Sequence, residues 1–112
     1  MASNSTRENE IVGVVAQADL VAYQPGAVVS RVLIKKPSGT VTVFAFEAGE
    51  ELSEHTSPFD ALVLMIEGEA EIQISGTGHR LKSGDLLKLP ANQPHAVKAA
   101  KRFKMILIML RD

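Results

Sequence analysis

Two histidines, His55 and His95, each stand between a proline-containing loop and a strand-like stretch. Ser57 follows His55 by two residues, and Gln93 precedes His95 by two. An imidazole can ligate a metal ion. Because an imidazole titrates at a pH of about 6.5, it can also bind a carboxylate or move a proton without a metal. The pair therefore predicts either a metal site or a metal-free binding site.

The residue content excludes several other chemistries. The chain has no cysteine, so disulfides, thiolate metal sites and a cysteine nucleophile are ruled out. Ser57 has no acid partner in sequence reach and no GxSxG motif occurs, which argues against a serine hydrolase. Gly76-Thr77-Gly78 is interpreted as a hairpin turn, because no phosphate loop with its lysine follows.

Charge and apolar content limit the partners and the location. A net charge of −1, a single tyrosine and no tryptophan predict no binding to nucleic acid. The longest apolar run, residues 105–110, is too short to span a bilayer, and the polar N-terminus lacks the core of a signal peptide. We therefore expect a cytoplasmic protein with no membrane partner. Residues 1–10 are predicted to be a flexible tail and residues 11–112 a single domain.

Turn-forming glycines and prolines recur along the chain at a spacing of roughly 8–12 residues, which indicates an all-β sandwich or barrel. The stretches between them are rich in Val, Ile, Leu, Thr and Phe. The predicted strands cover residues 28–36, 40–46, 61–67, 69–75, 79–82, 85–90, 95–99 and 103–110. Residues 8–21 fit either a short helix or an added edge strand, and the sequence does not decide between them.

The distribution of apolar residues also predicts a second subunit. Residues 69–75 alternate between apolar and polar side chains, so one face of that strand is in water. Residues 62–66 and 105–110 are apolar on both faces. A single-layer barrel of this length has too little material to cover its own outer face, and we therefore expect a homodimer.

The glycines, prolines and histidines follow two spaced motifs. The first, G(X)5HXH(X)3-4E(X)6G, and the second, G(X)5PXG(X)2H(X)3N, are characteristic of the cupin superfamily. The chain resembles these proteins over residues 40–110, and within them the small single-domain cupins. This resemblance implies a double-stranded β-helix, or jelly-roll, barrel. The matching positions are Gly49, His55 and Gly68 in the first motif and Gly84, Pro90 and His95 in the second.

The departures from these motifs weaken the implied metal site. Metal-binding cupins place three histidines and a glutamate at the barrel mouth. Here Ser57 replaces the second histidine, Ala61 (or Leu62 with the longer spacing) replaces the glutamate, and Ala99 replaces the final asparagine. Two imidazoles without an anionic partner are expected to hold a divalent transition metal only weakly.

Three nearby side chains could supply a third donor. Strand alternation should direct Asp60 and Glu54 away from the cavity, and Gln93 is a poor metal donor. The sequence therefore predicts no cofactor with certainty. A divalent transition metal held weakly by His55 and His95 is one alternative.

The leading hypothesis is a cupin of unassigned activity that binds a small, partly apolar ligand, with His55 and His95 at the cavity mouth. The alternative is a metal-dependent enzyme of the oxygenase or isomerase kind with an unidentified third ligand, so catalysis is left open. For Val63 and Met65 a plain core role competes with ligand binding. The other predicted ligand-binding residues are Phe44, Phe46, Ser57, Ala61, Gln93 and Val97.

Overall fold

The computed structural model describes residues 13–112, so the predicted tail at residues 1–10 lies outside the described residues. Over the described range the chain forms one short 3-10 helix and eight strands. The elements are η1 (Gln17–Leu20), β1 (Val28–Lys36), β2 (Gly39–Phe46), β3 (Glu51–His55), β4 (Asp60–Ile74), β5 (Thr77–Lys82), β6 (Leu86–Leu89), β7 (His95–Lys98) and β8 (Phe103–Leu110). Within residues 13–112 no helix is long and apolar enough to cross a membrane.

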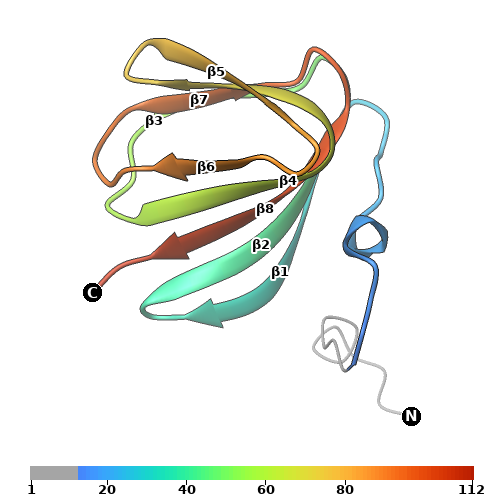
Figure 1. Cartoon of the computed structure of the whole chain (residues 1–112), viewed down its shortest axis with the longest axis horizontal. Coiled ribbons are helices and arrows are strands. Elements are labelled where there is room, and N and C mark those ends of the chain that lie inside the picture. Colours follow the sequence, from blue (N-terminus) through green and yellow to red (C-terminus); the bar gives the residue numbers. More distant parts are fainter. Residues whose placement is uncertain (1–12) are drawn as a thin grey trace.

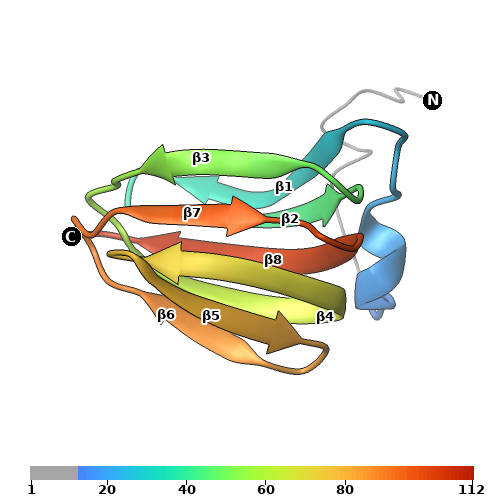
Figure 2. The same cartoon turned by 90° about the horizontal axis from the view of Figure 1, so that it is seen from above.

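The strands form two antiparallel sheets that share β4 and face each other (Figures 1 and 2). The first half of β4 pairs with β8 and β6, and β8 continues through β2 to β1. The second half of β4 pairs with β5 and β7, and β7 pairs with β3. The fold is the all-β jelly-roll barrel that the sequence predicts.

Strand β4 corrects one expectation from the sequence. The sequence predicts that a strand ends at Gly68, but β4 runs through this glycine and is 15 residues long in total. Gly68 has a φ of +81°, a left-handed conformation that glycine adopts without strain. A Cβ atom there would lie 2.8 Å from the Cα of Phe103, so only glycine fits this close approach of two backbones. Gly68 thus bends β4 from one sheet into the other.

The sequence pattern also missed β3. Its residues are mostly exposed, and the strand pairs only with β7 at the edge of its sheet. An edge strand needs no continuous apolar face, so the polar stretch before His55 carries no clear strand signal.

The core lies between the inner faces of the two sheets. Phe44 and Phe46 both face inward on β2, where they pair with Met105 and Phe103 of β8. Phe46 and Phe103 are fully buried, and their rings stack with centroids 4.6 Å apart. The barrel end that holds these two rings and Gly68 is called the packed end below. The opposite end, which holds His55 and His95, is called the mouth end.

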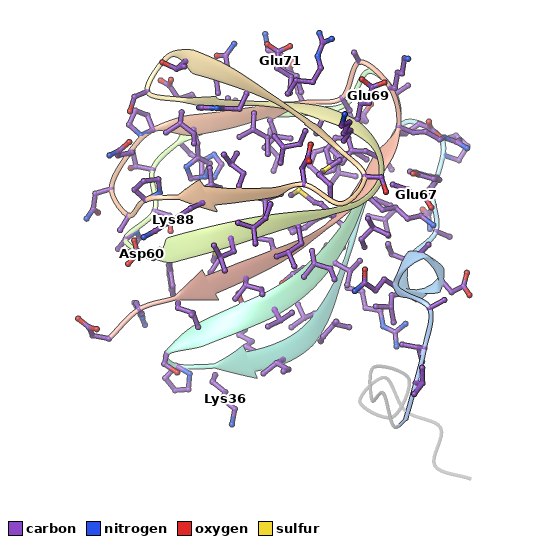
Figure 3. All side chains as sticks on the ribbon, in the orientation of Figure 1. Lys36, Asp60, Glu67, Glu69, Glu71 and Lys88 are labelled. Atoms are coloured by element: carbon purple, nitrogen blue, oxygen red, sulfur yellow. The ribbon has the colours of Figure 1, made fainter. Side chains whose placement is uncertain are left out.

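The charged side chains differ between the two ends. Figure 3 shows Glu67 and Glu69 toward the packed end, Glu71 near the middle of the upper sheet, and Asp60 and Lys88 toward the mouth end. The glutamates alternate along β4 with buried residues such as Ala70 and Ile72. They are therefore surface groups on a half-buried strand, as their spacing predicts.

Residues 17–23 cover part of the outer face of the first sheet. Leu20 and Val21 pack on Val43 and Ala45 of β2 and form a second buried cluster outside the barrel. Of the two alternatives for residues 8–21, the described part therefore has the short helix, a 3-10 helix at residues 17–20, and not the edge strand. This segment covers only some of the apolar outer face.

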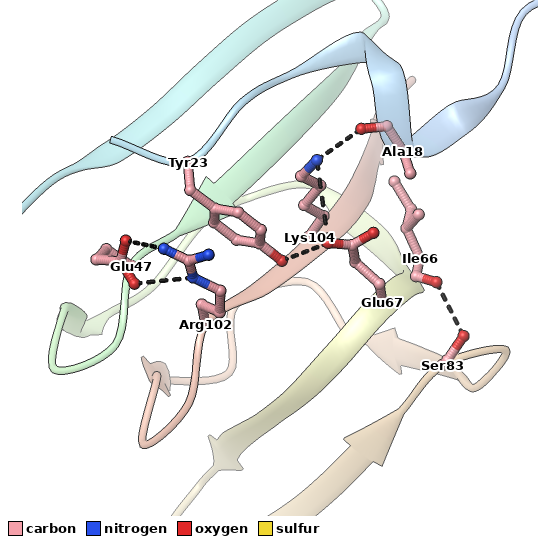
Figure 4. A network of polar contacts seen from close by, with 8 residues as sticks. All are labelled: Ala18, Tyr23, Glu47, Ile66, Glu67, Ser83, Arg102 and Lys104. Carbon is pink, nitrogen blue, oxygen red and sulfur yellow. Dashed lines mark hydrogen bonds and ion pairs between the residues drawn. The ribbon is translucent and has the colours of Figure 1, made fainter. Parts of the chain in front are cut away.

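Polar contacts fix this segment at the packed end (Figure 4). The Tyr23 hydroxyl donates a hydrogen bond to Glu67 Oε2 at 2.8 Å, and Lys104 Nζ donates to the carbonyl oxygen of Ala18 at 2.6 Å. Arg102 forms a two-point ion pair with Glu47, and its guanidinium lies 4.3 Å from the centre of the Tyr23 ring. Burial and the neighbouring Glu67 carboxylate raise the pKa of Tyr23, so its hydroxyl stays protonated and donates.

Candidate functional site

His55 and His95 meet at the mouth end of the barrel. His55 is the last residue of β3 and His95 the first of β7, and the two residues pair directly across these strands. Their ring centroids are 4.3 Å apart, with an angle of 65° between the ring planes. The two motif histidines therefore form one pair, although 40 positions separate them in the chain.

Backbone carbonyls set the orientation of both rings. The Nδ1 atom of His55 lies 2.9 Å from the Ser53 carbonyl oxygen, and that of His95 lies 3.2 Å from the Gln93 carbonyl oxygen. A carbonyl oxygen can only accept, so each Nδ1 carries the proton and donates it. In the neutral rings both Nε2 atoms then have a free lone pair with which to accept a hydrogen bond.

The loop before His95 is tied to the loop after His55. The Asn92 N–H donates to the Ser57 carbonyl oxygen at 2.7 Å, which joins the two motif segments. Asn92 has a φ of +65° and stands where the second cupin motif has glycine, a conformation that asparagine tolerates better than most residues. Pro90 and Pro94 further restrict this loop. The histidines are thus held by a rigid rim.

Burial is the main influence on the proton affinity of His95. Desolvation lowers its pKa, and the nearby His55 lowers it further, while the hydrogen bond to the Gln93 carbonyl acts in the opposite direction. The neutral form of His95 is therefore favoured near neutral pH, which leaves its Nε2 atom an acceptor.

Below the two rings lies a cavity of about 60 Å³ between the sheets. Apart from the two imidazoles and the Ser57 hydroxyl, its wall is made of apolar side chains. Seven of the ten predicted ligand-binding residues line it: Phe44, His55, Ser57, Ala61, Val63, His95 and Val97.

The other three predicted residues do not line this cavity. Phe46 is fully buried in the packed end, and Met65 is buried in the core at 4% exposure. Both point inward as the alternation predicts, but they lie deeper in the barrel than the cavity reaches. Gln93 is exposed on the loop before His95, where its side-chain oxygen accepts a hydrogen bond from Ser75 Oγ at 3.4 Å. These three residues therefore lie outside the wall of this cavity.

Six residues of the cavity wall were missed by sequence reasoning. Three of them alternate along β8, and that spacing within the apolar run 105–110 could have revealed them. Phe59 gave no such signal, because it lies in the short segment between Pro58 and the start of β4. The missed residues are Leu52, Phe59, Leu89, Met105, Leu107 and Met109.

The donor set does not fit a tightly held divalent metal ion. Among residues 13–112, no three His, Cys, Asp or Glu side chains come together as a metal site would need. Asp60 is engaged elsewhere, since its Oδ1 atom accepts a hydrogen bond from the Ala91 N–H at 3.1 Å. Glu54 is exposed and does not belong to the cavity wall. An anionic third ligand for the two imidazoles would have to come from outside the described residues.

Comparisons with solved structures agree with this architecture. A conserved protein of unknown function from Streptococcus pyogenes superposes with a TM-score of 0.87 at 31% identity, over 91% of this chain and 90% of its own. A cupin superfamily protein from Desulfitobacterium hafniense gives a TM-score of 0.84 at 33% identity, over 88% of this chain and 90% of its own. A DMSP lyase from Ruegeria pomeroyi gives 0.70 at 25% identity, over 76% of this chain and 47% of its own.

The sequence profile of the cupin domain matches residues 42–110, which include both histidines. No curated protein matches the chain. The two sheets that share β4 form a double-stranded β-helix barrel, and the histidine pair lies at one end of it. The chain belongs to the cupin family.

Proposed function

We propose that this cupin binds a small, partly apolar molecule in the barrel cavity, with His55 and His95 at the mouth. One observation carries the proposal: the cavity wall is apolar except at its rim, where two fixed imidazoles and one hydroxyl are placed. Ligand sites commonly combine an apolar wall with a few oriented polar groups. The free Nε2 atoms suit a ligand group that donates a hydrogen bond.

The cavity size limits the ligand. Its volume of about 60 Å³ is less than half of the ~150 Å³ that accommodates benzene in an engineered cavity. Only a short alkyl group fits, with its polar part at the rim. A small aliphatic alcohol has these features, so 1-butanol serves as a neutral probe.

The test is a titration of the protein with 1-butanol. Binding is monitored through the NMR chemical shifts of the cavity methyl groups and the histidine rings. We expect saturable binding in the millimolar range, and affinity about 5-fold lower in at least one of His55→Ala and His95→Ala, because the single O–H of the alcohol loses the acceptor to which it donates. His79→Ala removes the third histidine, which lies on β5 outside the cavity wall, and should bind as the wild type does. Unsaturable shifts, or equal loss in all three variants, would refute the proposal.

A metal-dependent enzyme of the oxygenase or isomerase kind is the second candidate. It is favoured by the Nδ1 contacts, because histidines that ligate metals usually donate the other ring N–H to a carbonyl or carboxylate. Metal analysis of protein purified without a histidine tag separates the candidates. Near-stoichiometric metal that is lost in both His55→Ala and His95→Ala would replace the binding proposal with the enzyme.

We also propose that the functional unit is a homodimer that joins the outer faces of the β1-β2-β8-β4-β6 sheet. The proposal is supported by Ile34, Leu86 and Leu110, each more than half exposed, on the face that residues 17–23 leave open. Sedimentation at micromolar concentration should show a dimer, and Leu86→Asp should shift it to monomer. Val14→Asp is the control, because Val14 is fully exposed on the N-terminal segment. A wild-type monomer would contradict the proposal.

A further inference from the structure

A shallow hollow beside the cavity mouth carries three cationic side chains. It measures about 420 Å³, and its wall is formed by Lys35, Lys36, Pro37, Thr40, Phe59 and Arg111. No acidic side chain belongs to this wall. The acidic neighbours in sequence are Asp60, which accepts a hydrogen bond from the Ala91 N–H, and the last residue of the chain.

The hollow adjoins the barrel cavity. Phe59 belongs to the walls of both. Thr40 of the hollow pairs with Met109 of the cavity wall, and Lys35 pairs with Thr40. Directly paired residues of neighbouring strands face the same side of a sheet, so these three side chains form a row along the inner face. Phe59 is therefore the side chain that stands between the cavity and the cations of the hollow.

The cations of the hollow are not neutralised within residues 13–112. The ion pairs in that range involve Lys101, Arg102 and Lys104, all near the packed end. Arg111 is nevertheless oriented: its Nε atom donates to the Pro37 carbonyl oxygen at 3.1 Å, and its guanidinium lies 4.9 Å from the centre of the Phe59 ring. This arrangement leaves both terminal NH₂ groups of Arg111 available to an anion.

We propose that the ligand is a small organic anion, whose short alkyl part enters the cavity and whose phosphate or carboxylate group binds Lys35, Lys36 and Arg111. The inference rests on the proposed function, because it assigns the charged part of a ligand whose apolar part lies in the barrel. Three cations around one hollow favour a group with more than one negative charge, so a phosphate monoester is the better fit.

The experiment compares probes that share one alkyl chain or one head group. Butyl phosphate, 1-butanol and inorganic phosphate are titrated separately into the full chain at low salt and followed by NMR. Wild-type protein should bind butyl phosphate at least about 10-fold more tightly than 1-butanol, because charge-assisted hydrogen bonds are added. The difference should shrink at high salt, since the cations are exposed.

Variants assign the difference to the hollow. Lys35→Ala combined with Arg111→Ala should lower the affinity for butyl phosphate about 10-fold and change that for 1-butanol by less than about 2-fold. Lys88→Ala is the matched control. Lys88 is also at the mouth end, but it pairs with Leu62 and belongs to neither wall. It should leave the affinity for both probes unchanged.

Three outcomes separate the two proposals. Equal affinity for butyl phosphate and 1-butanol in the wild type would overturn the anion assignment and leave cavity binding intact. An affinity for butyl phosphate that is unchanged in the Lys35→Ala, Arg111→Ala double variant would also overturn the anion assignment. In the third outcome, inorganic phosphate shifts the NMR signals of Arg111 but neither alkyl probe shifts the signals of the cavity. That result would support the anion site and overturn the proposed function.

Discussion

The two ends of the barrel use similar residue types in opposite ways. At the packed end, Arg102 pairs with Glu47, Lys101 with Glu69 and Lys104 with Glu67. Arg102 lowers the pKa of Glu47, so this carboxylate is ionised at neutral pH. At the mouth end, the cations of the hollow have no acidic partner among the described residues, and both histidine Nε2 atoms have no hydrogen bond there. Polar groups contribute to folding at one end and are left available for binding at the other.

The aromatic residues show the same division. Phe46 is fully buried and stacks on Phe103, whereas Phe44, two residues earlier on the same face of β2, lines the cavity and is only partly buried. The same side chain on the same strand thus fills a core at one end and shapes an opening at the other. Core packing and cavity lining are therefore divided between the two ends of one barrel axis.

The largest effect is expected from truncation at the packed end. Phe46→Ala should lower the free energy of unfolding by about 3–5 kcal/mol, because a fully buried ring is replaced by a void. Phe44→Ala should cost only about 1–2 kcal/mol, since that ring is partly exposed and already borders a cavity. Urea denaturation of both variants measures the difference. Equal losses of unfolding free energy in the two variants would contradict the difference in packing between the two ends.

A smaller effect is expected at two glycines with nearly the same backbone conformation. Gly68 at the packed end has a φ of +81°, and Gly76 in the β4–β5 turn near the mouth has a φ of +84°. Gly68→Ala should cost about 2–4 kcal/mol, because the added Cβ meets the backbone of residues 102 and 103 as well as the strained φ.

Gly76→Ala is the matched control for that experiment. A Cβ atom at Gly76 has no neighbour within 4 Å, so only the backbone strain of about 1 kcal/mol should remain. Thermal or urea unfolding of the two variants compares them directly. If both variants lost the same stability, close backbone packing would not be what distinguishes the packed end.

The sequence predicted the parts of the fold in which side-chain alternation is strong. The stretches at β1, β2 and β8 alternate or are continuously apolar, so their strands were expected. Gly68 misled the prediction, because a glycine that bends a strand and a glycine that ends one have the same local signature. β3 was missed since an exposed edge strand carries polar residues on both faces.

The apolar wall was partly predictable from strand alternation, whereas the histidine pair was predictable only because a spaced motif marks it. The pairing of His55 with His95 followed from the resemblance to cupins, because no local pattern connects two residues so distant in the chain. The basic hollow was not foreseen. Its residues come from the β1–β2 hairpin, the segment before β4 and the chain end after β8, and only the strand register brings them together.

The continuity of β4 bears on how a ligand can enter. This strand is hydrogen-bonded to β8 and β6 in one sheet and to β5 and β7 in the other. Because β4 passes from the first pair of ladders to the second at Gly68, the two sheets are joined covalently at the packed end. The opposite end has no such covalent link from β4, and there the imidazoles and Phe59 are the side chains that any solute entering the cavity would contact.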